Sequence, residues 1–213
     1  KYLNAGNWNA ILDLGEKVND WDMPQHMRSQ LDYAMALSAE NLGLAERALP
    51  LWKSLAGRTD IPLYEQAYAT YFLAKDAERR KDIRDAYALN KKTLELFTRL
   101  QQERSDRADP NRIKEAVNSL MDITEVANRI PEALEWVDKY NHFAPEGSPE
   151  YAGLRFREAR LYRKLGDSAK AQALLELIVK KEPNPPFGKA AASELRTFTV
   201  SRDLRSFMPG GGR

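Results

Sequence analysis

The side chains that could carry out catalysis are few in this chain of 213 residues. It contains two histidines, His26 and His142, and no cysteine. The histidines do not share a spacing such as H-x-x-x-H, which would place two metal ligands on one helix face. The lack of cysteine excludes disulfides, thiolate metal sites and a cysteine nucleophile. We therefore predict no catalytic residue, no metal site and no cofactor, and we expect that the chain is not an enzyme.

The glycine and charge patterns exclude further classes of function. The run Gly210–Gly212 has no strand before it, so it does not match a phosphate-binding loop. The formal net charge is +2 and the two signs are interspersed, which argues against a nucleic-acid partner. No apolar run approaches the roughly 20 residues that are needed to cross a bilayer. We expect no direct membrane insertion by this segment.

The hydrophobic residues recur every three or four positions, which is the spacing of amphipathic helices rather than strands. Asp109-Pro110 and Ser148-Pro149 have the composition of helix starts. Gly43 and Gly166 stand where helices should end. The pattern predicts helices over residues 7–19, 24–42, 45–57, 62–80, 82–104, 110–127, 131–142, 149–165, 168–181 and 186–198.

A short pattern recurs four times along these helices. A small or turn-forming residue is followed five positions later by an alanine, at Gly43–Ala48, Lys81–Ala86, Asn128–Ala133 and Gly166–Ala171. Alanine at a helix crossing allows the two axes to approach to roughly 8–10 Å. The pattern therefore predicts a series of helical hairpins, in which each unit packs on its neighbours.

This pattern resembles the tetratricopeptide repeat (TPR) superfamily, whose unit is a helix–turn–helix of 34 residues. The last unit matches best, with Ala159 at the helix crossing, Tyr162 late in the first helix, Gly166 in the turn, Ala171 in the second helix and Pro183 at the end. The resemblance implies an all-α fold, a right-handed superhelix of antiparallel helix pairs (an α-solenoid).

The resemblance also implies a division of the chain. Residues 1–22 would hold an orphan N-terminal helix of the array, and residues 23–184 would form four TPR-like units. Residues 185–200 would form a C-terminal capping helix, and residues 201–213 a disordered tail.

In this superfamily the first helix of each pair lines a concave face on which partner segments bind. The resemblance therefore implies a non-catalytic scaffold that binds another protein or a peptide segment. Two alternatives remain open, namely a substrate-presenting or regulatory domain of a larger envelope or secretion enzyme and a self-assembling repeat such as a homodimer. The positions that align with the concave face are Tyr33, Leu37, Tyr68, Tyr71, Lys75, Asn118, Asp122, Glu125, Phe156, Arg160 and Arg163.

These positions have two possible interpretations. The tyrosines are either aromatic anchors for a partner or ordinary packing residues with their hydroxyls in water. Arg160 and Arg163 could hold a carboxylate, with an acidic stretch beside them that includes Asp122 and Glu125, or all these charges could be solvated. The sequence leaves both interpretations open.

One helix departs from the family length. The repeated alanines are 38, 47 and 38 residues apart, and the longest interval holds the helix predicted over residues 82–104, with a polar Asn90 at a core position. The end of this helix is either covered by the adjoining helix or docks a partner. The closing stretch, Ala171–Leu195, is similar to the ends of bacterial cell-envelope TPR proteins. This similarity favours the periplasm, with the cytoplasm as the alternative.

Overall fold

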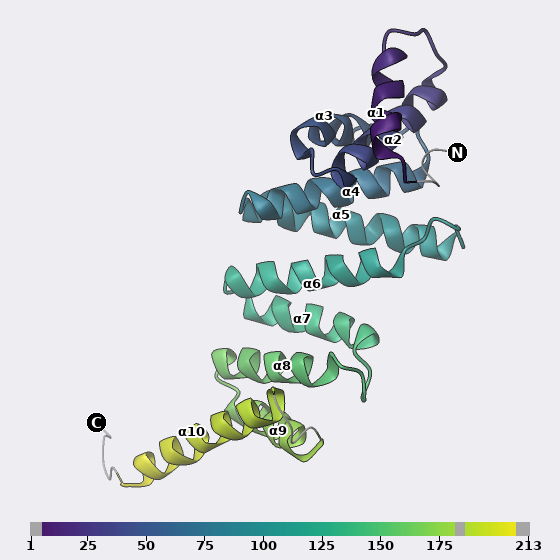
Figure 1. Ribbon diagram of the computed structural model, residues 1–213. Helices are drawn as coiled ribbons and strands as arrows, with labels where there is room; N and C mark the ends of the chain where they lie inside the picture. Colours follow the sequence, from purple (N-terminus) through teal and green to yellow (C-terminus); the bar gives the residue numbers. More distant parts are fainter. Residues whose placement is uncertain (1–5, 182–185, 208–213) are drawn as a thin grey trace. The chain divides into compact units, whose positions relative to one another are not determined.

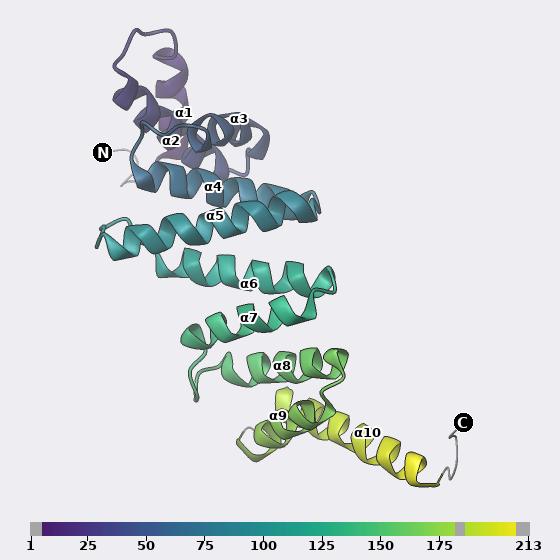
Figure 2. The same cartoon turned by 180° about the vertical axis from the view of Figure 1, so that it is seen from behind.

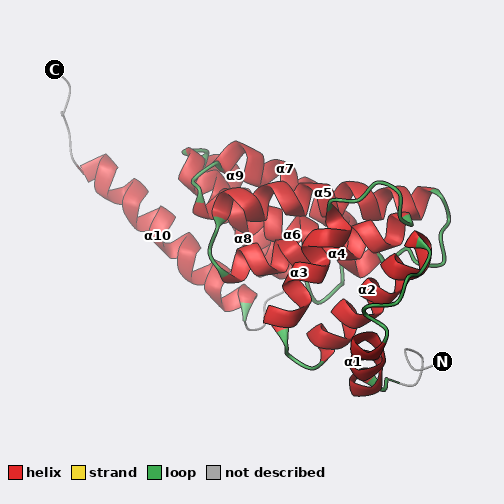
Figure 3. Ribbon diagram, turned by 90° about the horizontal axis from the view of Figure 1, so that it is seen from above, coloured by secondary structure: helices red, strands yellow, loops and turns green. Residues whose placement is uncertain are grey.

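The computed structural model describes residues 6–181 and 186–207. Within these ranges the regular structure is entirely helical and contains no strand (Figure 3). The described part holds ten α-helices and one 3-10 helix, and it confirms the predicted all-α fold. In chain order they are α1 (Trp8–Lys17), α2 (Gln25–Asn41), α3 (Ala45–Ala56), α4 (Leu63–Arg79), α5 (Ile83–Gln102), α6 (Pro110–Val126), α7 (Ile130–Tyr140), η1 (Asn141–Phe143), α8 (Tyr151–Leu165), α9 (Ser168–Lys181) and α10 (Phe187–Phe207).

The chain divides into two compact units, residues 1–120 and 121–213, and the division falls within α6. In the first unit, each helix from α1 to α5 packs against the next one along the chain (Figure 1). In the second unit, α7, α8, α9 and α10 pack in the same sequential way, and α10 also contacts α8 (Figure 2). Packing between sequence neighbours is the mode of repeat proteins.

Four hairpin turns share one backbone conformation. Gly43, Lys81, Asn128 and Gly166 have φ angles of +72°, +59°, +56° and +88°. After each of them, the next amide donates a hydrogen bond of 2.8–2.9 Å to the carbonyl five positions earlier. This bond is the mark of the Schellman helix ending, which needs a left-handed residue. The structure thus confirms the predicted turns, including the two in which lysine and asparagine stand in the place of glycine.

The alanines that follow these turns lie in the core. Ala48, Ala133 and Ala171 are completely buried, and Ala86 is 1% exposed. Because no space surrounds these methyl groups, a larger side chain would push the paired helices apart. The predicted role of the alanines at helix crossings is therefore confirmed.

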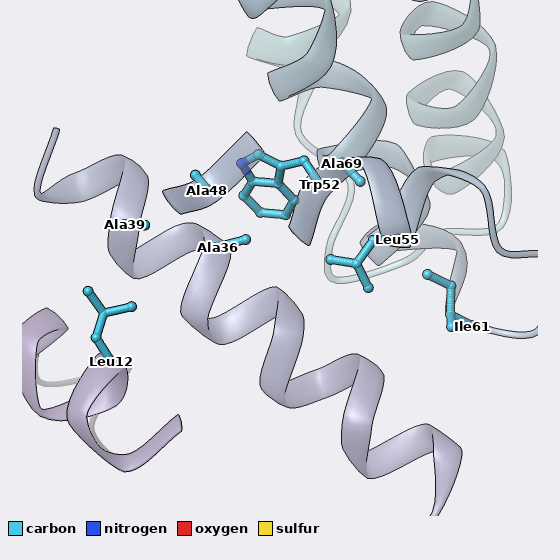
Figure 4. Packing of buried hydrophobic residues seen from close by; sticks show 8 residues of the cluster. All are labelled: Leu12, Ala36, Ala39, Ala48, Trp52, Leu55, Ile61 and Ala69. Carbon is cyan, nitrogen blue, oxygen red and sulfur yellow. The ribbon is translucent and has the colours of Figure 1, made fainter. Parts of the chain in front are cut away.

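The core of the first unit is built around Trp52. Its ring stacks on Phe72 with 4.8 Å between the ring centroids, and its indole nitrogen donates to the Glu40 carboxylate at 3.1 Å. Figure 4 shows Ala36, Ala48 and the Trp52 ring close together in the cluster that joins α1, α2, α3 and α4. The small side chains leave room for the large ring, so close helix packing and aromatic burial occur together.

The end of the long helix α5 is also buried. Leu96, Phe97 and Leu100 are at most 4% exposed, so the apolar stripe at this end is covered and does not offer a docking surface. Asn90, the polar residue at a core position, is also completely buried. Its side chain donates to Glu78 at 2.7 Å and to the Ala86 carbonyl at 2.9 Å.

Most helix limits lie within two residues of the predicted ones, and the end of the closing helix differs by more. The side chain of Asp109 accepts a hydrogen bond from the Asn111 amide at the start of α6, as predicted. The start of α8 differs, because this helix begins at Tyr151 instead of Pro149. The amide of Ser148 instead closes a turn onto the Pro145 carbonyl. The closing helix α10 reaches residue 207, so residues 201–207 of the expected tail are helical. The expected unit end at residue 183 and the rest of the tail lie outside the described residues.

Candidate partner-binding surface

One tyrosine of α2 contacts two tyrosines of α4, the next first helix, in the first unit. Tyr33 of α2 lies edge-on to Tyr64 and Tyr68 of α4, with centroid separations of 5.5 and 6.1 Å. Each of the three is partly buried and partly open to solvent. We call these residues, Tyr33, Tyr64 and Tyr68, the tyrosine cluster. It brings together two of the residues predicted from the sequence and adds one that was missed.

The tyrosine cluster is anchored to the core behind it. Tyr33 lies edge-on to Trp52 at 5.8 Å, and Tyr68 lies edge-on to Phe97 at 5.1 Å. Burial raises the pKa of Tyr33, and burial together with the neighbouring Glu65 raises the pKa of Tyr64 to about 12. The hydroxyl groups are therefore neutral at physiological pH and can both donate and accept hydrogen bonds.

Tyr71, one turn further along α4, is engaged within the protein. Its hydroxyl donates to Glu115 at 2.7 Å and accepts from Arg112 at 2.8 Å. The guanidinium of Arg112 lies 4.5 Å from the Tyr71 ring centroid and also donates to Glu115. Tyr71 is only 8% exposed. This predicted binding residue therefore ties α4 to α6 and presents little surface to a partner.

Lys75 is engaged in a similar way. Its ammonium group lies 2.9 Å from Glu78 and donates to Ser119 of α6 at 3.2 Å. Burial would raise the pKa of Glu78, but hydrogen bonds from Lys75, Asn90 and Ser119 outweigh it and hold the pKa below its usual value. The carboxylate is thus ionised and satisfied, which makes this part of α4 a polar bridge.

In the second unit the first helices are joined by ion pairs. Arg157 of α8 lies 2.6 Å from Asp122 and 2.9 Å from Glu125, both on α6. Lys164 contacts Glu125 at 2.8 Å. Burial alone would raise the pKa of Glu125. Lys164 and Arg157 outweigh this effect and hold the pKa below its usual value. We call these residues, Asp122, Glu125, Arg157 and Lys164, the ionic ladder.

The two arginines expected to hold a carboxylate are not brought together as a pair. Arg160 is exposed and forms no ion pair with the described residues, whereas Arg163 pairs with Glu194 of α10 at 3.1 Å. The arginine that pairs with the acidic residues is Arg157, which the sequence prediction missed. Its i+7 spacing to Lys164 places both on one face of α8, and this signal was available in the sequence.

The remaining predicted residues have supporting positions. Leu37 packs against the core cluster of the first unit, and Phe156 packs against that of the second. Asn118 is half-buried and has interaction partners. All three side chains are partly buried.

The histidines and acidic residues of the described part of the chain are not arranged as a metal site. No cluster of three or more histidine, aspartate or glutamate side chains that could hold a metal ion occurs there. His142 lies in η1, edge-on to Phe143, and His26 is exposed in the first turn of α2. Over the same residues, no helix has the length and apolar character that a membrane span requires.

Comparisons with known proteins identify the fold. No family model matches the sequence, and no curated protein matches it either. Among solved structures, a crystal structure of nearly identical TPR-like repeats from Podosopora anserina aligns with a TM-score of 0.54 and 17% identity. This alignment covers 87% of this chain and 91% of that one.

A second structure, BtubC (BKLC) from P. vanneervenii, aligns over 97% of this chain and 93% of its own, with a TM-score of 0.52 and 14% identity. These structures give no support to a cell-envelope origin, which stays a prediction. At such identities the likeness concerns the fold alone: this chain has a TPR-like α-solenoid fold of sequentially packed helices.

Proposed function

We propose that this chain is a non-catalytic protein-interaction scaffold that binds a segment of a partner protein across the first helices of its helix pairs. The observation that carries the proposal is the tyrosine cluster, in which the partly exposed Tyr33 of α2 contacts both Tyr64 and Tyr68 of α4. A repeat array has the extended surface that such binding needs.

The tyrosine cluster has the physical properties of an interface anchor. Tyrosine supplies a large apolar ring and a polar hydroxyl, which is why it is enriched where proteins bind one another. The edge-to-face contacts already hold the rings in place, so little side-chain entropy remains to be lost when a partner binds. We infer that Tyr33 and Tyr68 are the main contact residues, with Leu37 beside them.

The ionic ladder is a weaker candidate for the same role. Glu125 is already matched by both Arg157 and Lys164. A partner would have to break these ion pairs before it could replace them, and the exchange would bring little net gain. Arg160 and Arg163 are therefore proposed as peripheral contacts, since exposed charges contribute more to association rate than to affinity.

The proposal is tested by affinity capture from the organism of origin. The wild type is compared with a Tyr33→Leu/Tyr68→Leu variant, which keeps apolar volume at both positions, and with a matched Arg160→Ala/Arg163→Ala variant. Circular dichroism first shows that all three are folded. We expect the tyrosine variant to lose proteins that both the wild type and the arginine variant retain.

Recovery of the same proteins by the wild type and the tyrosine variant would overturn the proposal. If the purified chain captures only further copies of itself, and light scattering shows a mass that rises with concentration, the self-assembling alternative replaces the scaffold.

A further inference from the structure

A buried carboxylate lies next to the tyrosine cluster. Glu65, in the first turn of α4, is completely buried. Its Oε1 accepts a hydrogen bond from the Tyr64 hydroxyl at 3.0 Å, while no described group donates to Oε2. Neither does any described cation form an ion pair with it. Buried polar groups nearly always have partners, so an acceptor oxygen left open beside a surface cluster points to a missing donor.

Glu65 lies at the N-terminal end of a helix, a position that suits an acidic side chain. α4 begins after Pro62, so Glu65 is the third residue of the helix. The N-terminal end of a helix carries a partial positive charge, which stabilises a carboxylate in the first turn. The fold thus places an acidic side chain beside the tyrosine cluster and leaves one of its two oxygens without a hydrogen-bond donor among the described residues.

A cation already lies at the outer side of the cluster. Arg107 belongs to the segment between α5 and α6, and its guanidinium lies 5.3 Å from the centroid of the Tyr64 ring. Its side chain is 61% exposed, and its nearest carboxylate is that of Asp106 at 3.9 Å. Arg107 therefore rests on the aromatic surface without reaching Glu65, and it can leave at little cost.

We propose that the tyrosine cluster and Glu65 form a site for a basic side chain, arginine or lysine, of the bound partner segment. This inference rests on the proposed function and specifies its partner. The aromatic faces attract a cation, and the open carboxylate oxygen accepts its N–H groups once the Tyr64 side chain turns aside. Arg107 occupies the outer part of the site while no partner is bound and competes with it.

The charge preference is measured with three short peptides that differ at one position. They are acetyl-Gly-Gly-Arg-Gly-Gly-amide and its counterparts with citrulline and with glutamate in the place of arginine. Citrulline keeps the shape of arginine and removes the charge. Binding is followed by the NMR shifts of the tyrosine ring protons. We expect the arginine peptide to bind about tenfold more tightly than the citrulline peptide, as a charge-assisted hydrogen bond would give, and the glutamate peptide not to bind.

Two variants connect this preference to the site. Glu65→Gln keeps the size of the side chain and should remove most of the preference for arginine over citrulline. Arg107→Ala should raise the affinity for the arginine peptide a few-fold, because a competitor for the site has gone. Arg84→Ala, which removes an exposed arginine of α5, should change neither quantity.

Equal binding of the arginine and citrulline peptides, or no binding of any peptide, would overturn this inference, as would an unchanged preference in Glu65→Gln. Its failure is separable from that of the proposed function. If the Tyr33→Leu/Tyr68→Leu variant still loses captured proteins while the peptides show no charge preference, the scaffold stands and the basic-segment inference falls.

Discussion

The first helices of the first unit contact one another through aromatic rings, whereas those of the second unit are joined by ion pairs. Tyr33 meets Tyr64 and Tyr68 across α2 and α4, while Arg157 bridges Asp122 and Glu125 across α6 and α8. Both units nevertheless contain the same type of left-handed turn, followed five positions later by a buried alanine. The repeat spacing thus determines where the helices lie and leaves the chemistry of their faces free to vary.

This difference has an energetic consequence. The aromatic contacts bury apolar area and are insensitive to salt, whereas the ion pairs depend on charge, ionic strength and pH. We therefore expect that the two units respond differently to the same perturbation.

The largest effect is expected at the centre of the first unit. Trp52→Ala removes a ring that is 1% exposed and stacked on Phe72. It should lower the free energy of unfolding by about 3–5 kcal/mol, as large-to-small core substitutions do. Urea unfolding followed by circular dichroism measures the change, with Trp52→Phe as the milder comparison. A loss below about 1 kcal/mol would show that the aromatic core is not the main support of this unit.

The second effect concerns the helix crossing of the last hairpin. Ala171→Leu should cost about 1–3 kcal/mol, because the completely buried methyl group leaves no room for a larger side chain. Ala173→Leu, at an exposed position of the same helix, is the matched control and should be near neutral. Equal denaturation midpoints for the two variants would contradict the assigned packing.

The ionic ladder is tested by two arginines that are three positions apart. Arg157→Met breaks the bridge to Asp122 and Glu125 and should cost about 1–2 kcal/mol, between the values for exposed and buried pairs. Arg160→Met should cost close to nothing, because this side chain is exposed and has no ion-pair partner among the described residues. Adding salt should reduce the difference between the two. Identical stabilities would mean that the ladder does not hold α6 to α8.

The same ladder predicts a pH dependence. The pKa of Glu125 is lowered in the folded chain, so the folded state binds protons less readily than the unfolded state. Its stabilising contribution is present above the ordinary glutamate pKa and is lost as the pH falls through the lower, folded value. Glu125→Gln should therefore reduce the loss of stability between neutral and acidic pH, and Glu135→Gln, at an exposed site, should not. Parallel pH curves for Glu125→Gln and the wild type would refute this.

The smallest effect is expected at the turns. Lys81 adopts a left-handed conformation with φ of +59°. Lys81→Gly should raise the free energy of unfolding by about 1 kcal/mol, since glycine adopts this conformation without strain. Asn128→Gly should gain less, because asparagine tolerates the left-handed region better. Ala88→Gly in the interior of α5 should instead lose about 1 kcal/mol. A loss of stability in Lys81→Gly would contradict the shared turn geometry.

The fold was predictable from the sequence because its signals are local. The apolar spacing of three and four gives the helices, and the pairing of a turn residue with an alanine gives the hairpins. Even Lys81 could be assigned to a turn from its distance to Ala86. The Ser148-Pro149 helix start was wrong because the amide of Ser148 closes a turn onto the Pro145 carbonyl, and the helix begins at Tyr151.

The candidate site was less predictable because it depends on contacts between repeats. The alignment placed Tyr33 and Tyr68 on the correct helices, but it gave no reason to add Tyr64 or the buried Glu65. The alignment selected Arg160, which is exposed. The arginine that pairs with Asp122 and Glu125 is Arg157, one helical turn earlier. A repeat consensus locates a face, and only the packing of neighbouring helices determines which side chains are already engaged.

The central claim is that partners bind the aromatic first-helix face of the first unit. The most direct test is hydrogen–deuterium exchange of the purified chain with and without a captured partner protein. Our account predicts new protection over α2 and α4, around Tyr33 and Tyr68, that disappears in the Tyr33→Leu/Tyr68→Leu variant. Protection that is confined to α8, or that persists unchanged in this variant, would contradict it.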